Sequence, residues 1–448
     1  MNEIIVIISL LFFIALGYAL FLVSGLLSEL NFFEKLPYSF GLGMGLVAFQ
    51  LFLYSQLKIQ WNYETLLFPW IFLIFYVLYK KAPKIYIKHF NYKVKLSFTQ
   101  KCLSILLLIA VAYTAFEAWL RPLSAWDGWA IWLLKAKMFY IDGFVNPHAY
   151  HLLRDSYPYV INLSVTFLYI MLGKVDDRAV LLLFFGFYLM LGICFFNFSK
   201  KIFGITMSLF FTFLLLSLQN VIRHGGRFEA GYADLALGYY IFMSSTLLFQ
   251  YIKSNKPKAL ILCSIFLGLT SLVKDEGVVF SIIMQLMMFV VIIKNKKFKQ
   301  IFLSMIWLIP FLDWNLFKYI NDIHYSLYQN STIHLLRFPQ ILLQIAQELL
   351  NIQNWNILWP IFFIGLFPFL FIKKRGMNIY LFFIMFLQIL AYIFVFMISP
   401  YPPYIHVPNV MNRLLLHVVA LCVLLVEYVF ANTHVLYLLK GNGKKNAK

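Results

Sequence analysis

The feature that most constrains the fold of this chain is a series of long apolar runs that recurs along all 448 residues. About 20 apolar residues in a helix span the hydrocarbon core of a bilayer. Strands of a membrane barrel would instead give segments of about ten residues with alternating polarity. Because 62% of the residues are hydrophobic and only 12% are charged, the sequence predicts an all-α, polytopic transmembrane helical bundle.

The apolar runs predict about 13 spans. Their approximate ranges are 4–26, 39–57, 64–79, 100–118, 179–197, 203–220, 231–252, 258–273, 278–293, 300–317, 357–372, 379–398 and 411–431. The segment 157–172 is also apolar enough to cross, but a crossing there would invert every later loop. We therefore expect a re-entrant or interfacial helix at 157–172. The alternative keeps it as a span and adds or drops one elsewhere.

The formal net charge of +19 would suggest a nucleic-acid partner in a soluble protein. In a membrane protein, however, lysines and arginines collect in the cytoplasmic loops and set the orientation. Strict alternation of the spans places the basic loop 80–95, the other short basic loops and the basic tail on one side. We therefore expect an N-terminus outside, a C-terminus inside and no nucleic-acid partner.

Two outer loops are then long, about 119–178 and about 318–356, and the first contains SAWDGWAIWLLKAKMFY at 124–140. Ser124 suits a helix N-cap. The apolar residues that follow recur at helical spacing; they are Trp126, Trp129, Leu133, Ala136 and Tyr140. These features predict an amphipathic juxtamembrane helix on the outer surface, with its tryptophans at the level of the lipid headgroups.

Asp127 falls in the first turn of this expected helix, where the helix dipole favours a negative charge. It could therefore be only a helix-start residue, but an ionisable side chain among tryptophans at a membrane surface is also a functional candidate. Lys135 and Lys137 follow it. They could snorkel toward lipid phosphates or contact the phosphate of a lipid substrate.

Three other segments place ionisable residues at the same expected face. RHGGRFEAGYADLALGYY at 223–240 contributes Arg223, His224, Arg227, Glu229 and Asp234, and LTSLVKDEG at 269–277 contributes Lys274, Asp275 and Glu276. NRLLLHVVAL at 412–421 places Arg413 and His417 one helical turn apart. Each segment has a plain alternative: a buried ion pair for Asp234, a polar turn around Lys274, and a snorkelling arginine at 413.

Together, these residues suit an anionic lipid-linked substrate that reacts with an acceptor. A carboxylate can take the proton of an acceptor hydroxyl, and cations can bind the phosphate that leaves. The sequence contains no nucleotide-binding loop, GxSxG elbow or HExxH motif. The four cysteines lie within or at the edges of apolar runs without CxxC spacing, which favours small core residues over disulfides or metal ligands.

In order and spacing, these segments resemble those of the membrane-embedded GT-C glycosyltransferases, particularly the family 39-like group that includes protein O-mannosyltransferases and the lipid A aminoarabinose transferase. Asp127 in SAWDGWAIW matches the acidic residue in the first large outer loop of those enzymes. SYPYVINL at 156–163, DDRAVLLL at 176–183, GYADLAL at 231–237, LTSLVKDEG at 269–277 and NRLLLHVVAL are similar to other recurring family segments. Tyr159 replaces the second proline of the family's Tyr-Pro-Pro-Leu segment.

The resemblance implies inverting transfer of a sugar from a polyprenyl-phosphate donor to a glycan, lipid or protein acceptor at the outer face. Asp127 would act as the base or orient the acceptor. The phosphate-binding candidates are Arg413, Arg227 and Lys274, while Asp234 and Glu276 could hold sugar hydroxyls. His417, Glu229, Lys135 and Lys137 complete the expected substrate-binding set. Gly128 stands where many relatives carry a second acid, so no metal cofactor is indicated, although a divalent ion stays an open alternative.

The resemblance covers about 100–431 and divides the chain into three parts. Residues 1–97 form additional N-terminal helices with a basic cytoplasmic loop, 98–432 the GT-C-like catalytic module, and 433–448 a basic cytoplasmic tail. Loops rich in lysine, asparagine and isoleucine suggest a bacterial inner membrane as the location, with membrane lipids as neighbours. The sugar and the acceptor are not indicated.

Two other functions are compatible with the sequence. An O-antigen polymerase or ligase also uses outer-face arginines and polyprenyl substrates, but usually concentrates its cations in a large late loop. Here the loop 318–356 holds only Lys318 and Arg337 as basic residues. A lipid or solute transporter would place ionisable residues near the bilayer midplane and would interrupt its helices.

Overall fold

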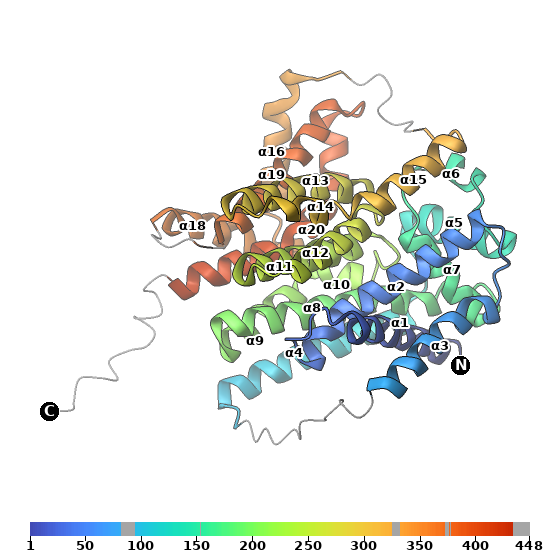
Figure 1. The fold of residues 1–448 in the computed structure, drawn as a ribbon. Helices are drawn as coiled ribbons and strands as arrows, with labels where there is room; N and C mark the ends of the chain where they lie inside the picture. Colours follow the sequence, from blue (N-terminus) through green and yellow to red (C-terminus); the bar gives the residue numbers. More distant parts are fainter. Residues whose placement is uncertain (82–94, 153, 325–331, 372–375, 377, 433–448) are drawn as a thin grey trace.

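The computed structural model describes residues 1–81, 95–152, 154–324, 332–371, 376 and 378–432. Within these ranges the chain forms helices and no strand, and the helices pack into one bundle (Figure 1). This confirms the predicted all-helical class. The expected basic tail 433–448 and most of the basic loop 80–95 lie outside the described residues.

Among the described residues, eight helical segments are long and apolar enough to cross a membrane, which identifies an integral membrane protein. They are α1 (Asn2–Ser24), α2 (Phe32–Gln56), α4 (Phe98–Leu120), the segment Ala179–Phe203 that includes α8 (Leu182–Phe203), α11 (Asp234–Ser254), α13 (Asp275–Lys294), α19 (Asn378–Ile398) and α20 (Pro403–Asn432).

Two bent helix pairs would raise the number of spans to ten. One joins α9 (Ile205–Ser217) to α10 (Gln219–Gly226) at 67°, and the other joins Phe298–Ser304, which includes α14 (Ile301–Ser304), to α15 (Leu308–Ile320) at 43°. The shorter helices α3 (Tyr63–Lys81), α12 (Pro257–Ser271) and α18 (Leu358–Phe371) occupy three further predicted spans. A helix therefore lies in each of the 13 predicted ranges, while the span count of 13 stays a prediction.

The helix α7 (Val160–Leu172) accounts for the ambiguous segment 157–172. At 1.5 Å per residue its 13 residues measure about 20 Å, less than the roughly 30 Å of a bilayer core. Every residue from Val160 to Ile170 is buried, and the helix packs against α1, α2 and α5 (Leu133–Asp142). A surface position is therefore excluded, and α7 is an internal helix of the bundle.

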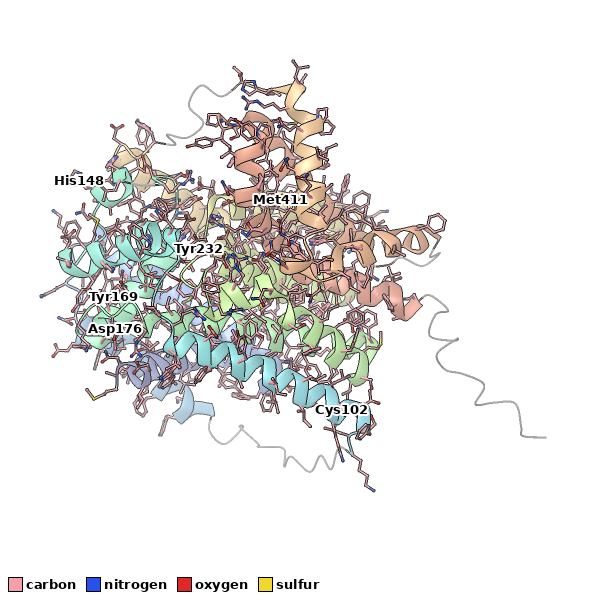
Figure 2. The ribbon with its side chains drawn as sticks, turned by 180° about the vertical axis from the view of Figure 1, so that it is seen from behind. Cys102, His148, Tyr169, Asp176, Tyr232 and Met411 are labelled. Carbon is pink, nitrogen blue, oxygen red and sulfur yellow. The ribbon has the colours of Figure 1, made fainter. Side chains whose placement is uncertain are left out.

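The two ends of the bundle differ in charge. At one end, which we call the basic end, lysines lie in the last turns of α8, α11 and α13. There Lys256 pairs with Glu29, and Lys201 Nζ lies 3.0 Å from Glu34 Oε2. At the other end, which we call the site end, α4 and α12 finish and α11 and α13 begin. In Figure 2, α4 runs from Cys102 at the basic end toward the end that contains Tyr232.

The loop helix around Asp127 differs from its prediction. Ser124 Oγ donates to the Phe228 carbonyl (3.4 Å) and makes no cap. Residues 126–127 are helical, Gly128–Trp132 form a π-helical turn, and α5 follows directly. Because this turn holds one extra residue, the two exposed tryptophans, Trp126 and Trp129, do not share a face with the buried Leu133 and Ala136. The expected continuous lipid-facing stripe is therefore wrong.

Glycines bring α1 and α2 into close contact. A Cβ atom on Gly17 would lie 2.0 Å from the Ser39 carbonyl oxygen, and one on Gly43 would lie 1.9 Å from the Phe13 carbonyl oxygen. Small residues at helix crossings let membrane helices approach closely. The first two helices therefore form a tight pair. All four cysteines are free, and three are buried, as expected for core residues.

Candidate ionic site at one end of the bundle

Asp234 is the centre of a group of ionisable side chains at the site end. It is the first residue of α11, and its side chain is fully buried. Oδ1 accepts from Lys274 Nζ (2.7 Å) and from His417 Nε2 (3.0 Å), and Oδ2 accepts from Arg413 Nε (3.0 Å). A carboxylate is stable in such a dry position only when donors surround it, and the helix N-terminus adds favourable partial charge.

Arg413 connects Asp234 to Asp127. The guanidinium Nη2 donates to Asp127 Oδ2 at 2.6 Å while Nε binds Asp234, so one planar side chain holds two carboxylates. Its central carbon lies 4.6 Å from the centre of the Tyr232 ring, where the ring face attracts a cation. The contact joins α20 to the loop helix, although their residues are far apart in the chain. Tyr232, labelled in Figure 2, is partly buried.

Lys274 is the N-cap residue of α13 and is 1% exposed. Besides Asp234, its Nζ lies 3.1 Å from Glu276 Oε1 and 5.7 Å from the centre of the Tyr157 ring. Burial lowers the pKa of Lys274, but the attraction of Asp234 and Glu276 outweighs burial, so the net shift of the pKa is upward. The ammonium charge is therefore kept in a nearly dry environment.

His417 lies one turn after Arg413 on α20 and links the group to α19. Its Nδ1 lies 2.9 Å from Tyr392 Oη. If Nε2–H donates to Asp234, Nδ1 accepts from the tyrosine hydroxyl, which fixes the tautomer of the ring. We call the six side chains Asp127, Asp234, Lys274, Glu276, Arg413 and His417 the ionic cluster.

The ionic cluster is close to electrically balanced. Three carboxylates (Asp127, Asp234 and Glu276) face two permanent cations (Lys274 and Arg413), so the formal charge is −1 with His417 neutral. An anionic ligand that simply added to this cluster would be repelled.

The structure brings these six predicted residues together and places four others elsewhere. Lys137 Nζ pairs with Asp177 Oδ2 at 2.6 Å. Arg227 Nε lies 3.6 Å from Glu117 Oε2, and Glu229 pairs with Arg223. None of these pairs includes a member of the ionic cluster.

Lys135 is buried rather than directed to the lipid. It is 1% exposed, its Nζ donates to the Arg154 carbonyl oxygen at 2.8 Å, and the Tyr150 ring centre is 4.5 Å away. Burial lowers the pKa of Lys135 to about 7. Because the side chain is buried, the expectation that Lys135 snorkels toward lipid phosphates is wrong, while a contact with a substrate phosphate stays a prediction.

Sequence reasoning missed two groups of residues. Tyr392 and Tyr157 contact the ionic cluster, but tyrosines within or beside apolar runs look like ordinary membrane-interface residues. A second polar group lies beside α10: Arg223 Nη1 donates to Asn354 Oδ1 (3.1 Å), and Glu348 accepts from the Asn354 amide and from the Trp355 indole (2.8 Å each). Its members come from two distant segments that no motif connects.

Within the part of the chain that the structure describes, no group of three or more His, Cys, Asp or Glu side chains is arranged to hold a metal ion. No protein-family model matches the chain, and comparisons with curated proteins and with solved structures also find no match.

Proposed function

We propose that this protein is a membrane glycosyltransferase of the GT-C type that moves a sugar from a polyprenyl phosphate to an acceptor hydroxyl. The ionic cluster supports the proposal, because it combines a carboxylate base with cations for a phosphate. Since the lysine-rich basic end suits the cytoplasm, the cluster would face the outside of a bacterial inner membrane.

In this proposal, the donor phosphate takes the place of Asp127 at Arg413. The exchange keeps the guanidinium neutralised and frees the Asp127 carboxylate. Asp127 then accepts the proton of the acceptor hydroxyl. The acceptor oxygen forms the new bond at the anomeric carbon, while the bond from that carbon to the phosphate oxygen breaks. The configuration inverts in one displacement, and Arg413 and Lys274 stabilise the phosphate that leaves.

The remaining members of the cluster divide into positioning and binding roles. Both oxygens of Asp234 are taken by donors, so we assign it to positioning Arg413 and Lys274 rather than to sugar hydroxyls. Glu276 differs, because its Oε2 is buried and has no hydrogen-bond partner among the described residues. That oxygen is suited to accept from a sugar hydroxyl. Ligand contacts by Arg227, Glu229, Lys135 and Lys137 stay predictions without support.

The observation that carries the proposal is the 2.6 Å contact between Arg413 Nη2 and Asp127 Oδ2, because it couples the base to the phosphate site. The test is Asp127→Asn in purified protein, with sugar transfer and donor binding measured separately. We expect transfer to fall by about 10²–10⁴-fold and the donor to bind at least as tightly as to the unmodified protein, since the competing carboxylate is gone.

Asp142→Asn is the matched control, because Asp142 ends α5 and its carboxylate accepts from Asn146 Nδ2 (2.7 Å), away from the ionic cluster. It should transfer within about twofold of the unmodified protein, as expected for a surface change. Transfer near the unmodified rate in Asp127→Asn would reject the base assignment. Loss of donor binding together with transfer would reject the exchange step.

A lipid or solute transporter is the second candidate, and two observations favour it. Two apolar helix pairs are broken, and Glu427, five residues before the end of α20, is buried with its Oε1 accepting from Ser199 Oγ at 2.6 Å. Intramembrane carboxylates and broken helices are common in transporters. Vesicles that move a labelled lipid-linked sugar across the bilayer without forming product would favour transport.

A further inference from the structure

An apolar hollow of about 400 Å³ lies between the α1–α2 pair and the break that separates α14 from α15. Its volume falls within the roughly 300–1,000 Å³ of small-molecule sites. The lining includes Leu46 on α2, Leu269 and Leu272 at the end of α12, and Trp307 and Ile309 at the break. Ile309 is 68% exposed, so the hollow opens at the side of the bundle that meets lipid. We call it the α1–α2 groove.

A hydrocarbon chain is the occupant that the lining of the α1–α2 groove selects. The lining is apolar except for Ser24, and a buried water needs two to four polar partners. Water therefore gains little there. The groove lies between membrane-spanning helices, where the surrounding solvent is the acyl and isoprenoid chains of the bilayer. One such chain fits an apolar groove that is open along its side.

The walls of the groove are fixed before any lipid enters. A Cβ atom on Gly45 would lie 2.4 Å from a methyl group of Leu269, so α2 and α12 are in direct contact at one edge. At the opposite wall, the Trp307 amide donates to Ser264 Oγ (2.9 Å) and its indole donates to Gln285 Oε1 (2.8 Å). These bonds hold the broken helix in place, so the groove is a preformed site.

The position of the groove relative to the ionic cluster selects the kind of chain. Leu272 lines the groove, and Lys274 of the cluster follows two residues later, so at most about 7 Å of backbone separates them. In a polyprenyl phosphate, the hydrocarbon begins at the phosphate ester oxygen. A phosphate at Lys274 and Arg413 would therefore place the first isoprene units at the groove. A glycerophospholipid has a glycerol unit between its phosphate and its two chains.

We propose that the α1–α2 groove binds the phosphate-proximal isoprene units of the lipid donor, which rests on the proposed function. The two leading helices then have a role that the resemblance leaves open: they form one wall of the lipid-chain site. Tests can use a polyprenyl phosphate that carries a diazirine on an early isoprene unit, with the full-length protein in phosphatidylethanolamine–phosphatidylglycerol nanodiscs. Crosslinked peptides are then mapped by mass spectrometry.

We expect the crosslinks to fall on α2, on the end of α12 or on the α14–α15 break. Unlabelled polyprenyl phosphate should compete, and an equal concentration of phosphatidylglycerol should not. Leu46→Trp fills the groove and should reduce the labelling at least fivefold. Leu11→Trp is the matched control, because Leu11 is exposed on α1 outside the groove; it should leave the labelling unchanged.

Crosslinks outside the groove, or equal labelling by a diazirine phosphatidylglycerol, would overturn the proposal. Mapping on the unmodified protein needs no substitution, so poor folding of Leu46→Trp does not remove the test. Groove labelling without sugar transfer would support the lipid site and reject the glycosyltransferase. Sugar transfer that depends on Asp127, without labelling of the groove, would support the glycosyltransferase and reject the lipid site in the groove.

Discussion

Lys274 and Lys135 are both 1% exposed and both lie near a tyrosine ring, yet their charged partners differ. Lys274 contacts two carboxylates from two elements, whereas Lys135 contacts a backbone carbonyl and a tyrosine ring. The net pKa shift is upward for Lys274 and downward for Lys135. Burial alone therefore does not distinguish the two lysines; the ionisable partners that each one meets do.

The comparison also separates two ways in which a membrane protein tolerates a buried amine. The charged form of Lys274 is kept by carboxylates, so the site retains a permanent cation that can serve a phosphate. Lys135 can lose its proton near neutral pH, and its long side chain then fills space in the core. Four predictions follow from this difference.

The largest expected effect comes from Asp234→Asn, which would leave Lys274 in the position of Lys135, a buried amine with less charge compensation. Removing one partner of a buried ion pair costs about 3–5 kcal/mol. We expect strongly reduced thermal stability in detergent and no measurable sugar transfer. Glu29→Gln is the matched control on the exposed pair with Lys256 and should leave thermal stability nearly unchanged. Equal losses of thermal stability in both variants would show that the buried pair stabilises the protein no more than the control pair does.

The second prediction compares Lys274→Met with Lys135→Met. Both replace a buried amine with an apolar side chain of similar length. Loss of the cation at Lys274 should reduce transfer by about 10²–10³-fold, as for the removal of one electrostatic donor from an active site. Lys135→Met should keep transfer within about threefold. Similar activity losses, measured per folded protein, would mean that Lys135 also serves the reaction.

The third prediction concerns geometry rather than charge. Arg413 holds two carboxylates through Nε and Nη2, and a lysine presents only one nitrogen. Arg413→Lys should therefore reduce transfer by about 10–100-fold, which corresponds to roughly 1.4–3 kcal/mol for a lost charged hydrogen bond. Arg227→Lys, at a 3.6 Å contact with Glu117, should change transfer by less than about threefold. A mild effect at Arg413 would indicate that charge alone suffices.

The smallest effect is a pH dependence from Lys135. Its folded-state pKa of about 7 is below the ordinary lysine value. Between pH 7 and about 10 the unfolded chain binds a proton at this side chain that the folded protein does not. Stability should therefore rise with pH in this window, by up to about 1.4 kcal/mol per unit. Thermal unfolding at pH 7 and 9 should show a shallower rise for Lys135→Met than for the unmodified protein.

Much of the ionic cluster could be predicted, because a charged side chain at the end of an apolar run is costly unless it has a partner or a function. Asp234 and Arg413 lie in the first residues of predicted spans, and Lys274 directly follows one, so the hydropathy locates all three at span ends. The sequence alone could not show that all three meet, because their contacts depend on which helices pack side by side. The pairing of Arg223 with Asn354 was hidden for the same reason.

Helix position was more predictable than helix environment. Each expected span contains a helix, but α7 is as apolar as a span and is nevertheless buried inside the bundle from Val160 to Ile170. Hydropathy shows that a segment is buried away from water, but it does not distinguish burial in the protein core from burial in lipid. The α7 helix is buried in the protein core. The exposure of Trp126 and the burial of Leu133 could not be predicted either, because the spacing assumes an α-helix throughout.

The π-helical turn at Gly128–Trp132 helps to determine the direction in which the Asp127 carboxylate points. In a helix with 3.6 residues per turn, one residue corresponds to about 100° of rotation. The Leu133 amide donates to the Gly128 carbonyl, so the turn contains one residue more than an α-turn. Deleting a single residue from this turn would swing Asp127 around the helix axis, away from Arg413, without changing any side chain of the ionic cluster. The direction of the Asp127 carboxylate therefore depends on the number of residues in this turn. A comparison of side-chain identities alone would not detect this dependence.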